Sequence, residues 1–299
     1  MSGMLQASTL AILMTLAFAP VAMAEVPLTW GPTGHVTAPV VVNGEGPYPF
    51  VIDTAADESA VYNWFATAHA MPNGRSSEIS GATGTQTETT TRLDSLSLDG
   101  QEIRNLEAGT APDRADGARL AGIVGVDLMT GHLAVLDLGC DTVALLPPDT
   151  DPASVAGRDA TMIEAGGLRE GKQLTLPVSL NGASGVATLD TGARSTIINH
   201  AFARAAGLDL DSGAFRSGTL VRGASQQAVA SVVGPIGAVR FAGVARAHVV
   251  ARIVELPVFQ EEGLADQPMM NLGLDLLHGV RLTIDYRQRR FWVAPSLCR

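Results

Sequence analysis

Cysteine is nearly absent from this sequence: only Cys140 and Cys298 occur among 299 residues, and there is no Cys-x-x-Cys pair. Two thiols cannot form a structural zinc site by themselves, so a fold held together by zinc is excluded. In an exported protein the two cysteines could form one disulfide that ties the middle of the chain to its end. The sequence leaves this pairing open, because it does not show whether their Cα atoms come within bonding distance.

Long hydrophobic runs are missing from most of the chain. After the N-terminal region no stretch reaches the roughly 18 apolar residues that a membrane-spanning helix needs. The first 24 residues contain no Asp, Glu, Lys or Arg and close in Ala22-Met23-Ala24, the small-x-small pattern of a signal-peptidase site. Pro20 disfavours a stable spanning helix there. We therefore predict a signal peptide over residues 1–24 and an exported mature protein, periplasmic or secreted, that begins at Glu25; an uncleaved anchor is the alternative.

Positive charge is scarce as well. The chain has 20 Lys and Arg against 30 Asp and Glu, a formal net charge of −10 and a pI near 5.0. Nucleic-acid-binding proteins normally present a basic face, so we predict no nucleic-acid partner.

Several catalytic motifs are absent. The six histidines lie far apart without an HExxH pattern, and no Gly-x-Ser-x-Gly elbow is present. The segment "GGLREGKQ", residues 166–173, has Gln173 where a phosphate-binding loop needs Ser or Thr. The sequence therefore predicts no metal and no cofactor.

What the chain does contain is a repeat. Residues 40–61 align with residues 176–198, with the two Asp-Thr pairs at an offset of 137, and residues 125–147 align without a gap with residues 273–295 at an offset of 148. Between these blocks, "SGATG" around Gly81 matches "RGASQ" around Gly223. Three ordered matches indicate an internal duplication. We predict an N-terminal lobe over residues 25–148, a linker over 149–173 that is rich in Pro, Gly, Asp and Ala, and a C-terminal lobe over 174–299.

The local pattern is that of a mostly β protein. Each repeat starts with two apolar segments around an Asn-Gly pair, Asn43-Gly44 and Asn181-Gly182, which is a strong hairpin signal because both residues tolerate positive φ. We expect few helices, chiefly over 62–70 and 198–206. Asp127 and Asp275 are expected to cap short helical turns that follow them.

Each second apolar segment ends in Asp-Thr followed by a small residue: "FVIDTAADESAV" contains Asp53, and "TLDTGARSTIIN" contains Asp190. Two carboxyl groups brought together across a pseudo-twofold axis cannot both ionise, so one proton becomes shared. The ionised member can deprotonate a water while the protonated member polarises a carbonyl, which suffices for amide hydrolysis.

These residues, with the triplet Ile123-Val124-Gly125, resemble the aspartic proteases. The short loops look like those of retroviral proteases and their bacterial relatives, and two copies in one chain resemble the pepsin-like arrangement. The resemblance implies an all-β, two-lobed fold with a central cleft, a dyad, residues that brace the two loops, flap-like tips and substrate contacts beside the loops. The residues that match are Asp53 and Asp190 (dyad); Thr54, Thr191, Ala55 and Gly192 (loop bracing); Gly81, Ala82, Thr83, Gly223, Ala224 and Ser225 (flap tips); and Asp57 and Arg194 (substrate contacts).

Two positions depart from the family pattern. Ala55 stands where the family prefers Gly, and its Cβ would be penalised in any loop geometry with φ above zero. Asn271, in the second triplet, is polar where an apolar residue is expected. Asp57 and Arg194 hold equivalent places with opposite charge, which implies that the two ends of the cleft differ.

The resemblance predicts an aspartic endopeptidase that acts on a peptide or protein substrate. Because the duplication supplies both catalytic halves, one chain does not need to dimerise. The alternative is a non-catalytic peptide-binding protein that has kept the fold, for which Ala55 and Asn271 are the arguments.

Overall fold

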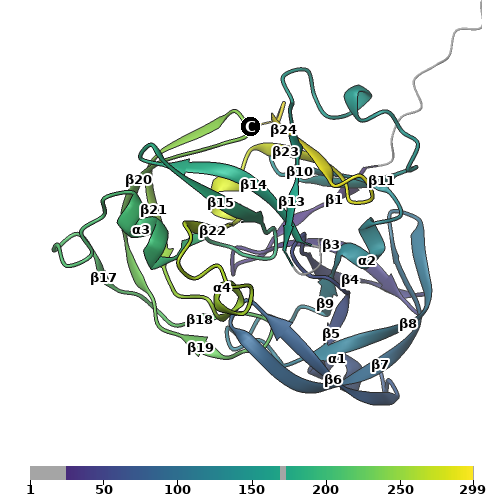
Figure 1. Cartoon of the computed structure of the whole chain (residues 1–299). Coiled ribbons are helices and arrows are strands. Elements are labelled where there is room, and N and C mark those ends of the chain that lie inside the picture. The colour runs from purple at the N-terminus through teal and green to yellow at the C-terminus, as the bar shows by residue number, and fades with distance from the viewer. Residues whose placement is uncertain (1–24, 169–172, 299) are drawn as a thin grey trace, which may run out of the picture.

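The computed structural model describes residues 25–168 and 173–298. The predicted signal peptide, residues 1–24, lies outside the described residues. The described chain is mostly β, with a few short helices, and forms two lobes (Figure 1). The predicted all-β, two-lobed class is confirmed.

The first lobe is built on an eight-stranded sheet in the order β2-β3-β4-β9-β5-β8-β7-β6, with an additional pairing of β3 with β7. It occupies the purple and blue part of Figure 1. Its strands are β2 (Thr29–Trp30), β3 (Val36–Val42), β4 (Glu45–Ile52), β5 (Ala60–Tyr62), β6 (Asn73–Gly81), β7 (Gly84–Leu98), β8 (Gln101–Ala111) and β9 (Gly122–Val124).

The second lobe repeats this sheet strand for strand. Its order is β13-β14-β15-β22-β16-β21-β20-β17, again with one additional pairing, of β14 with β20. A separate two-stranded sheet pairs β18 with β19. The strands are β13 (Gly166–Leu168), β14 (Gln173–Leu180), β15 (Ala183–Leu189), β16 (Ile197–Ile198), β17 (Arg216–Ser217), β18 (Val221–Arg222), β19 (Ala228–Val229), β20 (Val232–Phe241), β21 (Val244–Ile253) and β22 (Met269–Leu272). The identical order confirms the duplication.

The Asn-Gly hairpins form as expected in both lobes. Asn43 and Gly44 have φ values of 51° and 78°, and Asn181 and Gly182 have values of 49° and 89°. Two consecutive residues with positive φ match the right-handed twist of the flanking strands. These turns fix the register of the strands that lead to the two Asp-Thr loops.

A third sheet joins the lobes, in the order β1-β11-β10-β23-β24-β12. Its strands are β1 (Val26–Pro27), β10 (Leu133–Asp137), β11 (Thr142–Leu146), β12 (Thr161–Glu164), β23 (Val280–Asp285) and β24 (Arg290–Pro295). The connection runs through β10 and β23, which pair antiparallel. The segment predicted as a linker thus contributes β12 to this sheet and β13 to the second lobe, in addition to a short 3₁₀ helix over Pro152–Ser154.

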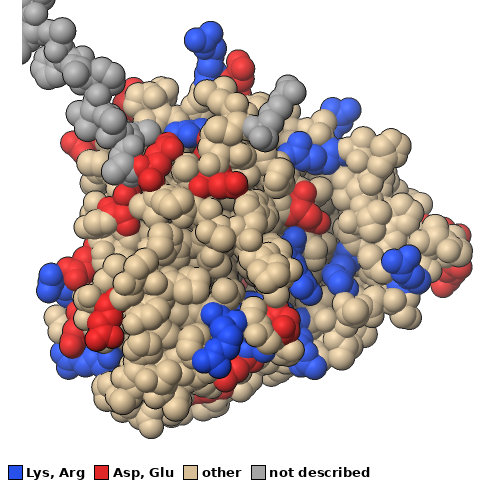
Figure 2. All heavy atoms as spheres, turned by 180° about the vertical axis from the view of Figure 1, so that it is seen from behind, with Lys and Arg blue, Asp and Glu red and all other residues tan. Residues whose placement is uncertain are grey.

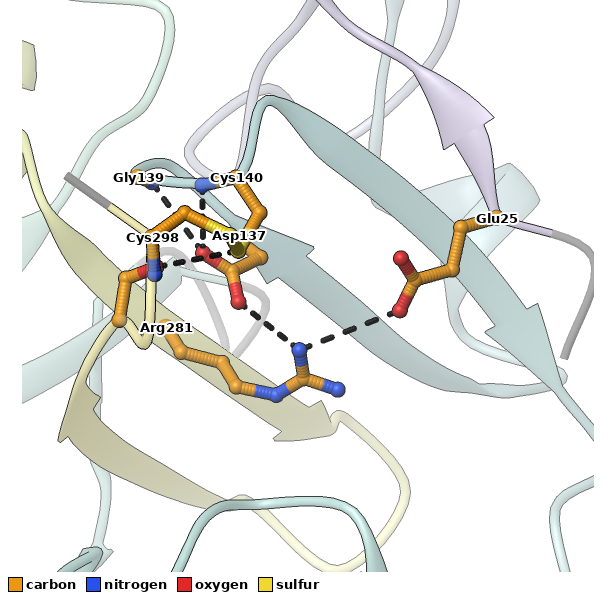
Figure 3. Close-up of a disulfide and its surroundings, with 7 residues drawn as sticks. Glu25, Asp137, Gly139, Cys140, Arg281 and Cys298 are labelled. Carbon is orange, nitrogen blue, oxygen red and sulfur yellow. Dashed lines mark hydrogen bonds and ion pairs between the residues drawn. A yellow bond between two sulfur atoms is a disulfide. The ribbon is translucent and has the colours of Figure 1, made fainter.

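The two cysteines form a disulfide beside this joining sheet (Figure 3). Cys140 follows β10, and Cys298 lies close to the C-terminus, with 4.8 Å between their Cα atoms. Next to it, Arg281 of the second half donates to Asp137 of the first at 2.8 Å, and Glu25 lies 4.0 Å from the same guanidinium nitrogen. A disulfide and a buried ion pair therefore link the two halves away from the Asp-Thr loops.

The helices are short: α1 (Asn63–Ala68), α2 (Val126–Met129), α3 (His200–Ala205), α4 (Pro257–Glu261) and α5 (Leu274–Leu277). Two of them, α1 and α3, lie where helices were predicted. At α3 the side chain of Asn199 accepts a hydrogen bond from the Phe202 N–H at 2.9 Å, an N-cap that fixes its first turn. In the part of the chain that the structure describes, no helix has the length and apolar character needed to cross a membrane.

One apolar core runs through both lobes and the joining sheet. Its largest fully buried side chains include Phe50 and Phe65 in the first lobe, Phe202 in the second and Phe291 in the joining sheet. Burying each such ring stabilises the fold by about 1.5–3 kcal/mol. This continuous core holds the lobes in one relative position, on which the geometry at their boundary depends.

Candidate active site

Asp53 follows β4 directly, at the boundary between the lobes. Its N–H donates to the carbonyl of Val124 at 3.0 Å and continues the parallel pairing of β4 with β9. Its Oδ1 accepts hydrogen bonds from the N–H groups of Ala55 at 2.9 Å and Ala56 at 3.0 Å. The tight loop thus turns its own N–H groups toward the carboxyl group that it carries.

Asp190 occupies the equivalent place after β15. Its N–H donates to the carbonyl of Leu272 at 3.1 Å, and its Oδ1 accepts from the Ala193 N–H at 2.8 Å. Its carboxyl group lies next to that of Asp53, although 137 residues separate the two in sequence. The structure thus brings together the two carboxyl groups that the repeat predicted.

Burial sets the protonation of this pair. Desolvation, together with the negative charge of Asp190, raises the pKa of Asp53 far above that of a free carboxyl group. Desolvation also raises the pKa of Asp190, while a hydrogen bond from Asn271 acts in the opposite direction. Since two neighbouring buried carboxyl groups cannot both carry a charge at low cost, the pair retains one proton well above the pH at which free carboxyl groups ionise.

Thr54 and Thr191 brace the two loops against each other. The Thr54 Oγ1 accepts from the Thr191 N–H at 3.0 Å and donates to the Leu189 carbonyl at 2.8 Å. Likewise, the Thr191 Oγ1 accepts from the Thr54 N–H at 3.1 Å and donates to the Ile52 carbonyl at 2.7 Å. Both side chains are buried, so these four bonds are shielded from water and fix the relative position of the loops.

Replacing Thr54 with valine is expected to lower the free energy of unfolding by about 2–4 kcal/mol, because the Thr191 N–H and the Leu189 carbonyl would remain buried without a partner. Urea denaturation followed by tryptophan fluorescence measures this loss. Thr54→Ser is the matched control: it keeps the hydroxyl, removes one methyl group and is expected to cost about 1 kcal/mol. Equal losses in the two variants would contradict the bracing role of the hydroxyl.

Gly192 and Ala55 follow the two Asp-Thr pairs at equivalent positions. Neither residue has a positive φ, so the penalty that alanine would carry in a loop geometry with φ above zero does not arise at Ala55. Gly192 is small for a different reason: a Cβ built on it would lie within 2.8 Å of all three atoms of the Asp53 carboxyl group. The absence of a side chain at Gly192 lets the Asp53 carboxyl group occupy that space.

Asp127 and Asp275 have a role that the sequence analysis missed. They do not cap the helices α2 and α5, whose N-caps are Gly125 and Gly273. Asp127 instead accepts from the hydroxyl of Ser59 at 2.7 Å and from its N–H at 3.0 Å.

The second half repeats this contact. Asp275 accepts from the hydroxyl of Thr196 at 2.7 Å and from its N–H at 2.8 Å. Each pair anchors the end of an Asp-Thr loop to the short helix that follows in the same lobe. The signal was present in the sequence, since Ser59 and Thr196 occupy matching positions in the repeat.

The two predicted flap tips meet. Gly81–Thr83 lies at the turn between β6 and β7, and Gly223–Ser225 lies between β18 and β19. The Oγ1 of Thr83 accepts from the Gly223 N–H at 2.9 Å and lies 3.1 Å from the Oγ of Ser225. Both hydroxyl-bearing residues are 1% exposed. The tips therefore pack against each other across the lobe boundary, which ordinary isolated hairpin turns would not do.

Ala82 of the first tip extends this contact. It packs on an apolar cluster of the second lobe that includes Val258 and Phe259 of α4. Its carbonyl accepts from the Val258 N–H at 3.4 Å. Ala224 lies close to Gly81: a Cβ built on Gly81 would be 3.2 Å from the backbone nitrogen of Ala224.

Asp57 and Arg194 differ in more than charge. Asp57 is half-buried, and its negative charge contributes to the raised pKa of Asp53. Arg194 is exposed, and its Nη1 donates to the Thr33 carbonyl at 3.4 Å. Burial, together with the positive charges of Arg114 and Arg194, lowers the pKa of nearby His35 to about 4. The surroundings of the two loops are therefore electrostatically unequal.

Three further residues contact the loops without having been singled out as site residues. Gln173 donates from Nε2 to the Ala55 carbonyl at 2.8 Å, and Tyr286 donates to the Thr54 carbonyl at 3.4 Å. Asn271 donates from Nδ2 to the Oδ2 of Asp190 at 2.6 Å. Gln173, the last residue of the segment 166–173, thus supports the loop that follows Asp53.

No group of His, Cys, Asp and Glu within residues 25–168 and 173–298 is arranged to hold a metal ion. On the face in Figure 2, charged side chains of both signs lie scattered between larger uncharged areas and form no continuous basic surface.

Comparison with protein families gives one match over most of the chain. A family model described as aspartyl protease matches residues 38–128 and 176–276. The two matched segments fall one in each half of the duplication, and each contains one of the two Asp-Thr loops. No curated protein matches the chain.

Proposed function

The chain belongs to the aspartyl protease family, and from that premise we propose that it is an endopeptidase that hydrolyses peptide bonds with a water activated between Asp53 and Asp190. The observation that carries the proposal is that these two carboxyl groups lie next to each other at the lobe boundary. They come from equivalent loops, and each is held by backbone N–H donors.

The proposed reaction needs only the dyad and a water. The ionised carboxylate takes a proton from the water as its oxygen bonds to the carbonyl carbon, and the protonated carboxyl group gives its proton to the carbonyl oxygen. In the second step the first carboxyl group protonates the amide nitrogen, the other takes a proton from one hydroxyl group, and the C–N bond breaks. The products are an amine and a carboxylic acid, and the dyad returns to its starting state.

We propose that the substrate is an extended peptide lying between the dyad and the two flap tips, bound through backbone hydrogen bonds as in strand addition. The contact between Thr83 and Ser225 supports tips that act together and must separate to admit a chain. Asp57 and Arg194 would then present opposite charges beside the two loops.

The alternative, a peptide-binding protein without turnover, rested on Ala55 and Asn271. Both residues are compatible with an active dyad: Ala55 has no positive φ, and Asn271 donates a hydrogen bond to Asp190. These observations favour the enzyme.

Export is part of the proposal. The disulfide between Cys140 and Cys298 supports an oxidising compartment, where such bonds persist. The mass of the protein purified from the periplasm or the medium checks this, since removal of residues 1–24 leaves Glu25 as the first residue. Retention of the full mass there would contradict the predicted cleavage.

The direct test is incubation of the mature protein with a mixed peptide library in isotopically labelled water, scanned from about pH 3 to 8. We expect cleavage that places one label in each new carboxyl group, without a trappable acyl-enzyme. An Asp53→Asn/Asp190→Asn double variant controls for contaminating proteases. Binding of peptides without cleavage at any pH would establish the non-catalytic alternative.

A further inference from the structure

The two halves of the site differ at one pair of positions beneath the dyad. In the first half Val51 of β4 is paired with Ile123 of β9. In the second half the equivalent residues, at the same offsets of 137 and 148, are Thr188 of β15 and Asn271 of β22. An apolar pair in one lobe thus corresponds to a polar pair in the other.

The polar pair forms a buried chain of hydrogen bonds that ends on the dyad. The Thr188 hydroxyl donates to the Oδ1 of Asn271 at 2.5 Å, and the Asn271 Nδ2 donates to the Oδ2 of Asp190 at 2.6 Å. Asn271 is 7% exposed and Thr188 is 3% exposed. Since the hydroxyl occupies the oxygen of the amide, the amide presents its N–H group to Asp190.

A hydrogen bond from a neutral donor to a carboxylate stabilises the charged form of that carboxylate. Asp190 receives such a bond at the oxygen that its own loop does not hold. Asp53 receives no equivalent hydrogen bond, because Ile123, which occupies the position of Asn271 in the first half, has no side-chain donor. An amide does not titrate in this range, so the bias is present at every working pH.

We propose that Asn271, oriented by Thr188, makes the dyad unequal: it holds Asp190 as the ionised carboxylate that activates water and leaves the shared proton on Asp53. The assignment rests on the proposed function and identifies Asn271 as a positioning residue that acts through Asp190.

Among the other titratable groups near the dyad, Asp57 favours the same distribution, and two buried tyrosines do not oppose it. The negative charge of Asp57 disfavours ionisation of Asp53. Tyr62 and Tyr286 lie close enough to Asp53 for its charge to affect their pKa values. Burial, together with this charge, raises the pKa of both phenols, so the two tyrosines stay neutral and form no ion pair with either carboxyl group. The Asn271 hydrogen bond keeps the pKa of Asp190 lower than burial alone would make it.

The decisive experiment measures titration without relying on activity. In an Asp53→Asn background only Asp190 of the dyad titrates, and carbon-13 NMR of labelled aspartate carboxyl groups reports its pKa. Adding Asn271→Leu, which keeps the number and branching of the side-chain heavy atoms but has no donor, is expected to raise that pKa by at least about 1 unit, since a hydrogen bond to a charged group contributes about 1.5–3 kcal/mol. An unchanged titration of Asp190 would overturn the proposal, whether or not the protein cleaves peptides.

The matched control uses the other half of the dyad. In an Asp190→Asn background the same Asn271→Leu change is expected to leave the titration of Asp53 nearly unchanged. If Asn271→Leu does not fold, Thr188→Val carries the test, because it removes only the orienting hydroxyl and should raise the pKa of Asp190 in the same direction. Equal shifts at Asp53 and Asp190 would show a general loosening of the site and contradict the assignment.

In the active protein the inference predicts a specific change in the pH profile. The acidic limb of kcat/KM reports protonation of the ionised carboxylate, so Asn271→Leu is expected to move it upward by about 1 pH unit. A merely structural role would reduce the height of the profile and leave its limbs in place.

Discussion

Replacement of either Asp53 or Asp190 by asparagine is expected to lower kcat by at least about 1000-fold. Each carboxyl group gives or takes a proton in both steps of the reaction, and the amide of asparagine cannot take its place in either step. The loss should be similar for the two variants, because the dyad acts as one unit. Steady-state cleavage of the best library peptide, measured from about pH 3 to 8, quantifies it.

Asp53→Asn is expected to differ from ordinary loss-of-function changes in its effect on stability. Burial and the charge of Asp190 raise the pKa of Asp53 from 3.8 to about 8. Between these values the folded state holds a proton that the unfolded state has released, so the stability contributed by this group is fully present below about pH 3.8 and is lost as the pH rises toward 8. Asp53→Asn removes this penalty.

We therefore expect Asp53→Asn to be inactive yet to unfold at a higher temperature than the parent protein at pH 7, with a smaller dependence of stability on pH. Thermal unfolding at several pH values measures both quantities. Asp137→Asn is the contrasting variant: the pKa of that carboxyl group is lowered by its hydrogen bonds, including one from Arg281, and its loss should destabilise the fold at neutral pH. An active Asp53→Asn variant would remove Asp53 from the mechanism.

Replacement of Gly192 by alanine is expected to reduce kcat/KM by about 100-fold. The added Cβ would lie within 2.8 Å of every atom of the Asp53 carboxyl group, so that group must move. A displacement of about 1 Å at a reacting group costs about two orders of magnitude in rate. Because Gly192 has no positive φ, the backbone itself accepts alanine and the loss arises at the carboxyl group.

The internal repeat supplies the control for this prediction. Ala55→Gly changes the equivalent position of the first loop in the opposite direction. It adds no atoms, should cost about 0.5–1 kcal/mol of stability, and should affect cleavage far less than Gly192→Ala. Comparable losses of activity in the two variants would indicate that both loops respond only to backbone changes and would contradict the steric account.

Part of this protein could be predicted from its sequence because the responsible signals are local. Asn43-Gly44 and Asn181-Gly182 mark hairpins through their own backbone preferences, and alternating apolar segments mark strands. The duplication then turns two weak Asp-Thr signals into one strong one, since a turn aspartate has no reason to recur with the same surroundings. These features were sufficient for the class, the two lobes and the two aspartates that meet at the lobe boundary.

The remaining features depend on which side chains meet across strands that are distant in sequence. In the sequence, Asn271 is only a departure from the family pattern. In the structure, the pairing of β15 with β22 brings its amide to Asp190, which is 81 residues away in sequence. The requirement for Gly192 comes from a carboxyl group in the other lobe, and Asp127 finds its partner Ser59 only after the first sheet has formed. Repetition of local patterns determined the two halves of the site, whereas the direction of each side chain across the lobe boundary, and with it the inequality of the two carboxyl groups, was decided by the tertiary structure.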